Sequence, residues 1–203
     1  MSISSITFRG SVMSVRSPLK TVLTSLRQFF QQLNKKPLGG DLQLFFVTVM
    51  TMSILFTLAS FFTGLYPGNE SGPDGLYLIG ILVLGIFINL IQGLIVGVVA
   101  LLGVSLVEHF FLLFVNVRYG FEKTMKSVIY ALFPCILFFW AVVIVEVPLA
   151  GLLLLFVFGL ITYLSVQIFH EMSKDRAIFV SLATSIVLAI LFYRWIFGSG
   201  LLL

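Results

Sequence analysis

The chain has 203 residues, of which 60% are hydrophobic and only 10% are charged. Soluble domains contain about 45–50% apolar and about 25% charged residues, so this composition excludes a soluble enzyme and a disordered or collagen-like chain. It predicts an integral membrane protein. The formal net charge is +4, but half of the twelve basic residues stand in the first 36 positions. That distribution is typical of orientation in a bilayer and not of nucleic-acid binding.

Residues 1–41 form a polar stretch without any acidic residue before Asp41, and we expect them to be cytoplasmic. Ser17-Pro18 is a helix-start signal. Apolar residues then recur every three or four positions, which predicts an amphipathic helix over about 18–34 that lies in the membrane interface. The basic residues expected to attract anionic lipid are Lys20, Arg27, Lys35 and Lys36. An acid-free start rich in Arg and Ser also suits an organelle transit peptide.

Five apolar segments follow within 42–203, and they predict an all-α polytopic membrane protein with five transmembrane helices. A helix needs about 20 apolar residues to cross about 30 Å of hydrocarbon, and four of the segments fit one crossing each. The second segment has twice that length, so it is either one helix that tilts, kinks or projects, or two short crossings. The segments are 42–65, 76–115, 128–145, 149–169 and 177–197.

The positive-inside rule favours a single crossing for 76–115. Eleven of the twelve Lys and Arg residues then lie on the side of the N-terminus, and Arg194 alone lies on the other. We therefore expect a cytoplasmic N-terminus and a C-terminus on the opposite side. The membrane would be a prokaryotic cell membrane, or an endomembrane in a eukaryote.

In the second segment, glycines and one asparagine recur every four positions, and a glutamine lies next to them. The glycines are Gly85, Gly93 and Gly97, and the two amide side chains are Asn89 and Gln92. Small residues spaced in this way allow helix backbones to approach closely, and buried amides avoid lipid by pointing at other helices. The stripe indicates helix packing, and a polar lining for a permeation path is the alternative.

Two pairs of titratable residues stand at the cytoplasmic ends of the second and fourth segments. They are Glu108 with His109, and His170 with Glu171. Neighbours on a helix point about 100° apart, so neither pair converges on one point. Hydrogen bonding at the interface is therefore the favoured interpretation, and a metal or proton site is the alternative. Because the chain contains no catalytic or phosphate-binding motif and only one cysteine, Cys135, we expect no enzyme activity and no cofactor.

From about Asp41 to its end, the chain resembles the Yip domain family, five-span membrane proteins named as interactors of Ypt/Rab GTPases. The residues that carry the resemblance are Asp41-Leu42, His109, Gly120-Phe121, Thr124, Tyr130, Pro134, Pro148, Gly151, Gly159, His170 and Ser173. The resemblance implies a non-enzymatic membrane partner in vesicle traffic, often an oligomer. Only about 41 residues precede the first span, which makes the chain similar to the short prokaryotic members and leaves GTPase binding open.

The favoured function is therefore a non-catalytic interaction, scaffold or membrane-organisation protein. Its expected partners are the lipid bilayer, other membrane proteins or a second copy of the chain. A small transporter or channel is an alternative, with a polar cavity around Asn89, Gln92, Thr162 and Gln167. An accessory subunit of a larger membrane complex is another.

Overall fold

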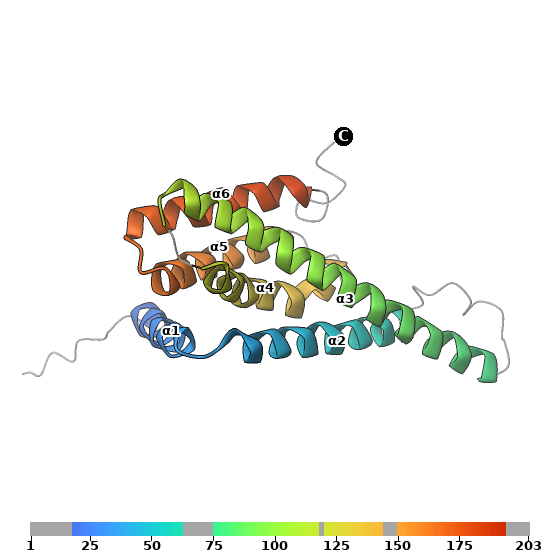
Figure 1. The fold of residues 1–203 in the computed structure, drawn as a ribbon. Helices are drawn as coiled ribbons and strands as arrows, with labels where there is room; N and C mark the ends of the chain where they lie inside the picture. Colours follow the sequence, from blue (N-terminus) through green and yellow to red (C-terminus); the bar gives the residue numbers. More distant parts are fainter. Residues whose placement is uncertain (1–17, 63–74, 118–119, 144–149, 194–203) are drawn as a thin grey trace, which may run out of the picture.

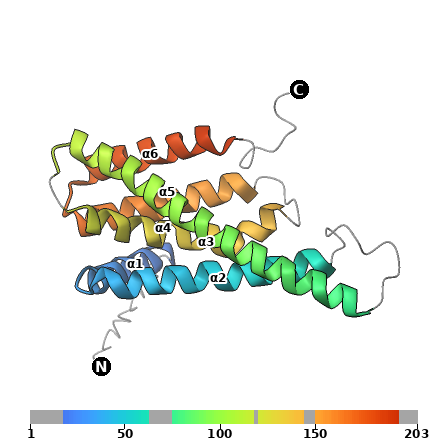
Figure 2. The ribbon, with the colours of Figure 1, turned by 45° about the vertical axis from the view of Figure 1, so that its right-hand side comes forward.

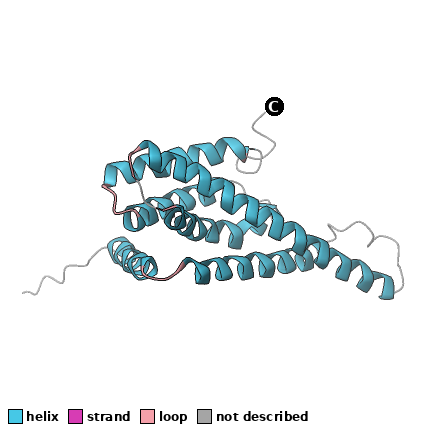
Figure 3. Ribbon diagram, in the orientation of Figure 1, coloured by secondary structure: helices cyan, strands magenta, loops and turns pink. Residues whose placement is uncertain are grey.

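The computed structural model describes residues 18–62, 75–117, 120–143 and 150–193. Every regular element in these ranges is an α-helix (Figure 3). The helices are α1 (Pro18–Asn34), α2 (Leu38–Phe62), α3 (Gly75–Phe114), α4 (Phe121–Val143), α5 (Ala150–Phe169) and α6 (Lys174–Leu191). Four of the expected transmembrane segments include residues outside the described ranges, namely those at 42–65, 128–145, 149–169 and 177–197.

Helices α2 to α6 run in alternating directions along one bundle (Figure 1). Helix α4 lies at its centre and packs against α2, α3 and α5, while α6 covers α5 and α3. Helix α1 crosses one end of the bundle and packs on α5. The apolar core takes one or more side chains from each of α2 to α6, for example Phe45, Leu101, Ile129, Phe158 and Leu188.

Helix α3 is one uninterrupted helix of 40 residues. At 1.5 Å per residue it is about 60 Å long, and its N-terminal part extends beyond the other helices (Figure 2). Large apolar side chains such as Val83, Phe87 and Ile95 are exposed along it. In lipid this exposure is favourable, because a helix that faces hydrocarbon needs an apolar surface.

Within the described ranges, three helices are long and apolar enough to cross a membrane: α2, α3 from Ile79 onwards, and α5. With their exposed apolar surfaces, they identify the protein as an all-α membrane protein.

Helices α4 and α6 begin before the apolar segments expected at 128 and 177. Each starts with charged residues, Glu122 and Lys123 in α4 and Lys174 to Arg176 in α6. Charged side chains are compatible with the first turns of a helix when that end lies outside the hydrocarbon.

Candidate functional site

Buried polar side chains gather at the end of the bundle where α3 and α5 end and where α4 and α6 begin. Helix α1 lies across the same end (Figure 1). The fully or almost fully buried residues here include Asp41, Glu108, Lys126, Ser127 and His170. This end of the bundle is therefore the candidate site.

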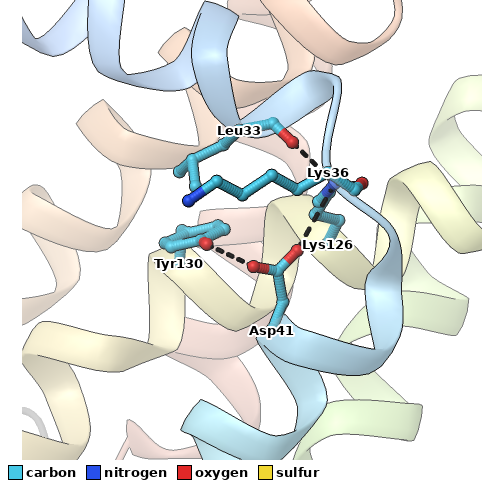
Figure 4. Close-up of polar contacts among 5 residues, drawn as sticks. All are labelled: Leu33, Lys36, Asp41, Lys126 and Tyr130. Atoms are coloured by element: carbon cyan, nitrogen blue, oxygen red, sulfur yellow. Dashed lines mark hydrogen bonds and ion pairs between the residues drawn. The ribbon is translucent and has the colours of Figure 1, made fainter.

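Lys126 and Asp41 form a buried ion pair between α4 and α2. Their Nζ and Oδ2 atoms lie 3.4 Å apart, and both side chains are at most 7% exposed. The Tyr130 hydroxyl donates a hydrogen bond of 2.5 Å to the other carboxylate oxygen, Oδ1. Residues 126 and 130 are one turn apart on α4, so both reach the same carboxylate (Figure 4).

The Lys126 ammonium group also bonds to the chain at the C-terminal end of α1. It donates a hydrogen bond of 2.7 Å to the carbonyl oxygen of Leu33 and a second one to that of Lys36 (Figure 4). The last carbonyl groups of a helix lack partners within the helix and carry partial negative charge. A lysine from α4 thus adds a positive charge at the C-terminal end of α1, whose own last turn contains no basic residue.

Aromatic side chains complete the attachment of α1. The ring of Phe30 packs edge-to-face on Tyr130 and on Phe169, with centroids 5.9 Å and 5.8 Å apart. Phe30 and Leu33 are buried, whereas Val22 and Phe29 remain exposed. Some apolar residues of α1 therefore pack on the protein, and others remain exposed.

Lys126 did not stand out in the sequence as a functional residue, where it counts only as one of the basic residues that indicate orientation. Asp41 and Tyr130 did appear among the residues that carry the family resemblance. The spacing of Lys126 and Tyr130 by four residues was the available signal, because it places both on one face of a helix.

Glu108 and His109 point to different neighbours, as expected from their adjacent positions on α3. The Glu108 side chain is 0% exposed and lies beside Ser127 of α4. The Nδ1 atom of His109 lies 3.1 Å from the Thr124 hydroxyl oxygen, and its ring packs edge-to-face on Phe121. At this end α3 therefore meets α4 through the His109–Thr124 contact, with Glu108 beside Ser127 of the same helix.

His170 follows the last residue of α5 and is 2% exposed. Burial lowers its pKa to about 4, and the positive charges of Lys123 and His109 act in the same direction. His109 therefore lies close enough to His170 to affect its pKa.

Glu171 is exposed and has a positive φ of 49°. The amide of Met172 donates to the carbonyl oxygen of Gln167, which is the pattern of a left-handed helix end. Asn116 has a φ of 60° and ends α3 in the same way. Glu171 therefore ends α5 in the left-handed conformation.

A groove of about 350 Å³ lies between these two helix ends. Its lining consists of Asn116, Val117, His170, Glu171, Met172, Ser173 and Arg176. Within the described ranges, no group of three His, Cys, Asp or Glu residues is placed to hold a metal ion.

The glycine stripe of α3 faces α2. A Cβ atom on Gly93 would lie 2.0 Å from the Ser53 hydroxyl oxygen, and one on Gly97 would lie 3.3 Å from both Val49 methyl groups. Gly85 is buried. The Asn89 amide donates a hydrogen bond of 3.0 Å to the Thr57 hydroxyl.

Gln92 was expected to point at another helix, but it is exposed on the outer face of α3. It precedes Gly93 by one residue, so its side chain is turned by about 100° from the stripe. Its neighbours in a shallow groove of about 310 Å³ are Phe87, Ile88, Ile91, Ile95 and Val96.

The basic residues assigned to the membrane surface are exposed where their side chains are described. These are Arg27, Lys35 and Lys36. The side chain of Lys20 lies outside the described part of the chain.

No curated protein and no solved structure matches the chain. The family model described as the Yip1 domain matches residues 20–196, from the first turn of α1 to beyond the end of α6. This match covers most of the sequence and confirms the resemblance drawn from its residues. The chain therefore belongs to the Yip1 domain family of membrane proteins.

Proposed function

We propose that all five helices from α2 to α6 cross the membrane. Their alternating directions support this arrangement (Figure 2). Helices α4 and α6 each place three charged residues in their first six positions, all at the end where α1 lies. Beyond those first turns, both helices continue with apolar residues, as a span requires.

The end that carries α1 is cytoplasmic in this proposal. The Lys and Arg residues within the described ranges gather there, namely Lys20, Arg27, Lys35, Lys36, Lys123, Lys126, Lys174 and Arg176. This distribution is what the positive-inside rule requires. Tags at the two ends of the chain should differ in protease access in sealed vesicles, and equal access would contradict the five-span arrangement.

Helix α1 is an interfacial helix in this proposal, attached to the protein through Phe30 and Leu33. Its exposed Val22 and Phe29 would enter the lipid interface, and Arg27, Lys35 and Lys36 would attract anionic headgroups. Each basic residue near such a surface contributes about 1 kcal/mol. The variant Arg27→Gln/Lys35→Gln/Lys36→Gln should retain less anionic lipid during purification, and unchanged retention would contradict the electrostatic part.

The function we propose is that of a non-catalytic scaffold that presents α1 at the membrane surface to other membrane proteins. The observation that carries this proposal is the buried Lys126–Asp41 pair, which holds the end of α1 in one position. A helix that only needed to touch lipid would require no such attachment. Yip1 family proteins are generally non-enzymatic.

Site-specific photocrosslinking on the full chain in native membranes tests this function. A crosslinker at exposed Gln28 or Gln31 of α1 should capture one discrete protein, whereas one at exposed Ile95 of α3 should capture lipid. The variant Lys126→Met should abolish the protein crosslink at Gln28. Crosslinks to lipid alone at both α1 positions would exclude the scaffold role.

A transporter or channel would need a common polar cavity. Its proposed lining residues occupy different surroundings: Asn89 is bonded to Thr57 of α2, Gln92 is exposed, and Thr162 is buried on α5. This separation favours the scaffold. Solute flux in liposomes that contain the purified protein would reverse the preference, and a fixed stoichiometry with larger subunits in mild detergent would favour the accessory-subunit role.

A further inference from the structure

Glu108 is a buried acidic residue that takes no part in the attachment of α1. Its side chain is 0% exposed, and neither carboxylate oxygen has a hydrogen-bond partner. An ionised carboxylate in an apolar interior is strongly unfavourable unless it is paired with a positive charge. An intramembrane acid in this state requires a cation.

The hydroxyl group of Ser127, which lies beside Glu108, also contacts a second serine on α5. The Ser165 hydroxyl donates to the carbonyl oxygen of Thr162 over 3.1 Å. The Ser127 and Ser165 oxygens lie 2.7 Å apart, and because Ser165 has donated elsewhere, Ser127 donates to Ser165. In this arrangement the Ser127 oxygen, which lies beside Glu108, can accept a hydrogen bond from a protonated carboxyl group.

The charged groups around Glu108 are directed elsewhere. On α4, Lys126 pairs with Asp41 of α2, and Lys123 acts on His170 at the end of α5. On α3 itself, His109 contacts Thr124. Lys174, Asp175 and Arg176 of α6 are exposed. In the described part of the chain, no ion pair reaches Glu108.

We propose that Glu108 and Ser127 form a binding site for one small monovalent cation, either a proton or a sodium ion. A proton would make the carboxyl group a donor to Ser127. Hydrogen bonds would then run from Glu108 to Ser127, from Ser127 to Ser165 and from Ser165 to the Thr162 carbonyl, and they would join α3, α4 and α5. A sodium ion would use the same oxygen lone pairs, so the two cations exclude each other.

Infrared difference spectroscopy of the full protein in lipid tests for the proton. At neutral pH we expect the carbonyl band of a protonated carboxylic acid, lost at alkaline pH and absent from Glu108→Gln. Glu122→Gln removes an exposed acid of α4 and is the matched control that keeps the band. Glutamine at position 108 can donate to Ser127, so this variant should fold.

Thermal unfolding at constant ionic strength tests for sodium. If the band is missing, exchange of potassium for sodium should raise Tm in the wild type and in Glu122→Gln but not in Glu108→Gln. Ser127→Ala provides a second variant: it should shift the band, or weaken the apparent sodium affinity about tenfold, by removing one oxygen. A spectrum of the ionised carboxylate together with a sodium-independent Tm would overturn the proposal.

Discussion

The two halves of α3 are held in the bundle by different means. Around residues 85–97, α3 contacts α2 through small residues, Gly93 against Ser53 and Gly97 against Val49, while its remaining surface is exposed and apolar. From Leu101 to the end of the helix, one side of α3 packs against α4 and α6, and Ser105 and Glu108 are fully buried there, while Leu106 and Phe110 on the other side remain exposed. The first half relies on close van der Waals contact, whereas the second relies on buried polar groups.

This difference determines how each half should respond to change. In lipid, van der Waals contact must supply what the hydrophobic effect supplies in water, so the first half is sensitive to added volume. Buried polar groups have few acceptable partners, so the second half is sensitive to loss of a partner and to pH. The same holds for α1, whose attachment depends on a buried ion pair at that end of the bundle.

The largest effect should come from Lys126→Met. This change leaves the Asp41 carboxylate buried without its cation and removes the hydrogen bonds from the ammonium group to the carbonyl oxygens of Leu33 and Lys36. Breaking a buried ion pair in this way costs about 3–5 kcal/mol. Unfolding in detergent measures the loss, and Lys36→Met is the control because that side chain is exposed.

Asp41→Asn in the Lys126→Met background removes the charge left behind and should restore part of the stability, since Asn can still accept the hydrogen bond from Tyr130. Equal stabilities of Lys126→Met and Lys36→Met would mean that the ion pair does not hold this end together.

His170 should make the polar end sensitive to acid. Its pKa is about 4 in the folded protein, below the ordinary value of 6.5, so on acidification the unfolded chain binds a proton first. Stability should fall as the pH drops from 6.5 to 4, by up to about 3 kcal/mol. His170→Gln should remove this part of the pH dependence, measured as unfolding free energy against pH.

Lys123→Gln offers an independent check, because its positive charge is one cause of the lowered pKa of His170. Without that charge the pKa should rise toward 6.5, and the acid-induced loss should become smaller. A larger loss in Lys123→Gln than in the wild type would contradict this origin of the shift.

Gly93→Leu should destabilise the first half of α3 by about 1–3 kcal/mol through overpacking. The clash is direct, since even a Cβ atom would lie 2.0 Å from the Ser53 hydroxyl and 3.2 Å from its Cβ. Gly80→Leu is the matched control on the same helix, because nothing lies within 4 Å of a Cβ there. Thermal unfolding ranks the two variants.

A partial rescue would locate the contact. Ser53→Gly removes the atoms that a side chain at position 93 meets, so it should recover part of the stability of Gly93→Ala. If Gly93→Leu and Gly80→Leu unfold alike, α2 and α3 do not meet at this glycine.

The parts of this architecture that follow from local pattern were accessible from the sequence. The helical class, the length of α3 and its glycine stripe all depend on residues within one or two turns of each other. The pairing of Asp41 with Lys126 joins positions 85 residues apart, and no periodicity connects them. The left-handed conformation at Glu171 was also hidden, because glutamate rarely adopts it.

The smallest effect should come from Asn89→Leu, although Asn89 was one of the conspicuous polar residues in the apolar sequence. Its amide donates to the Thr57 hydroxyl, and Thr57 in turn donates to the carbonyl oxygen of Ser53 over 2.8 Å. When the amide is lost, the Thr57 hydroxyl still has an acceptor for its hydrogen atom, so no buried donor becomes unpaired. Hydrogen bonds between membrane helices average about 0.6 kcal/mol, less than the expected cost of overpacking at Gly93.

A double-mutant cycle of Asn89→Leu and Thr57→Val should give a coupling energy of about 0.6 kcal/mol. A loss from Asn89→Leu greater than that from Gly93→Leu would reverse the comparison, since polar pairing would then hold both halves of α3.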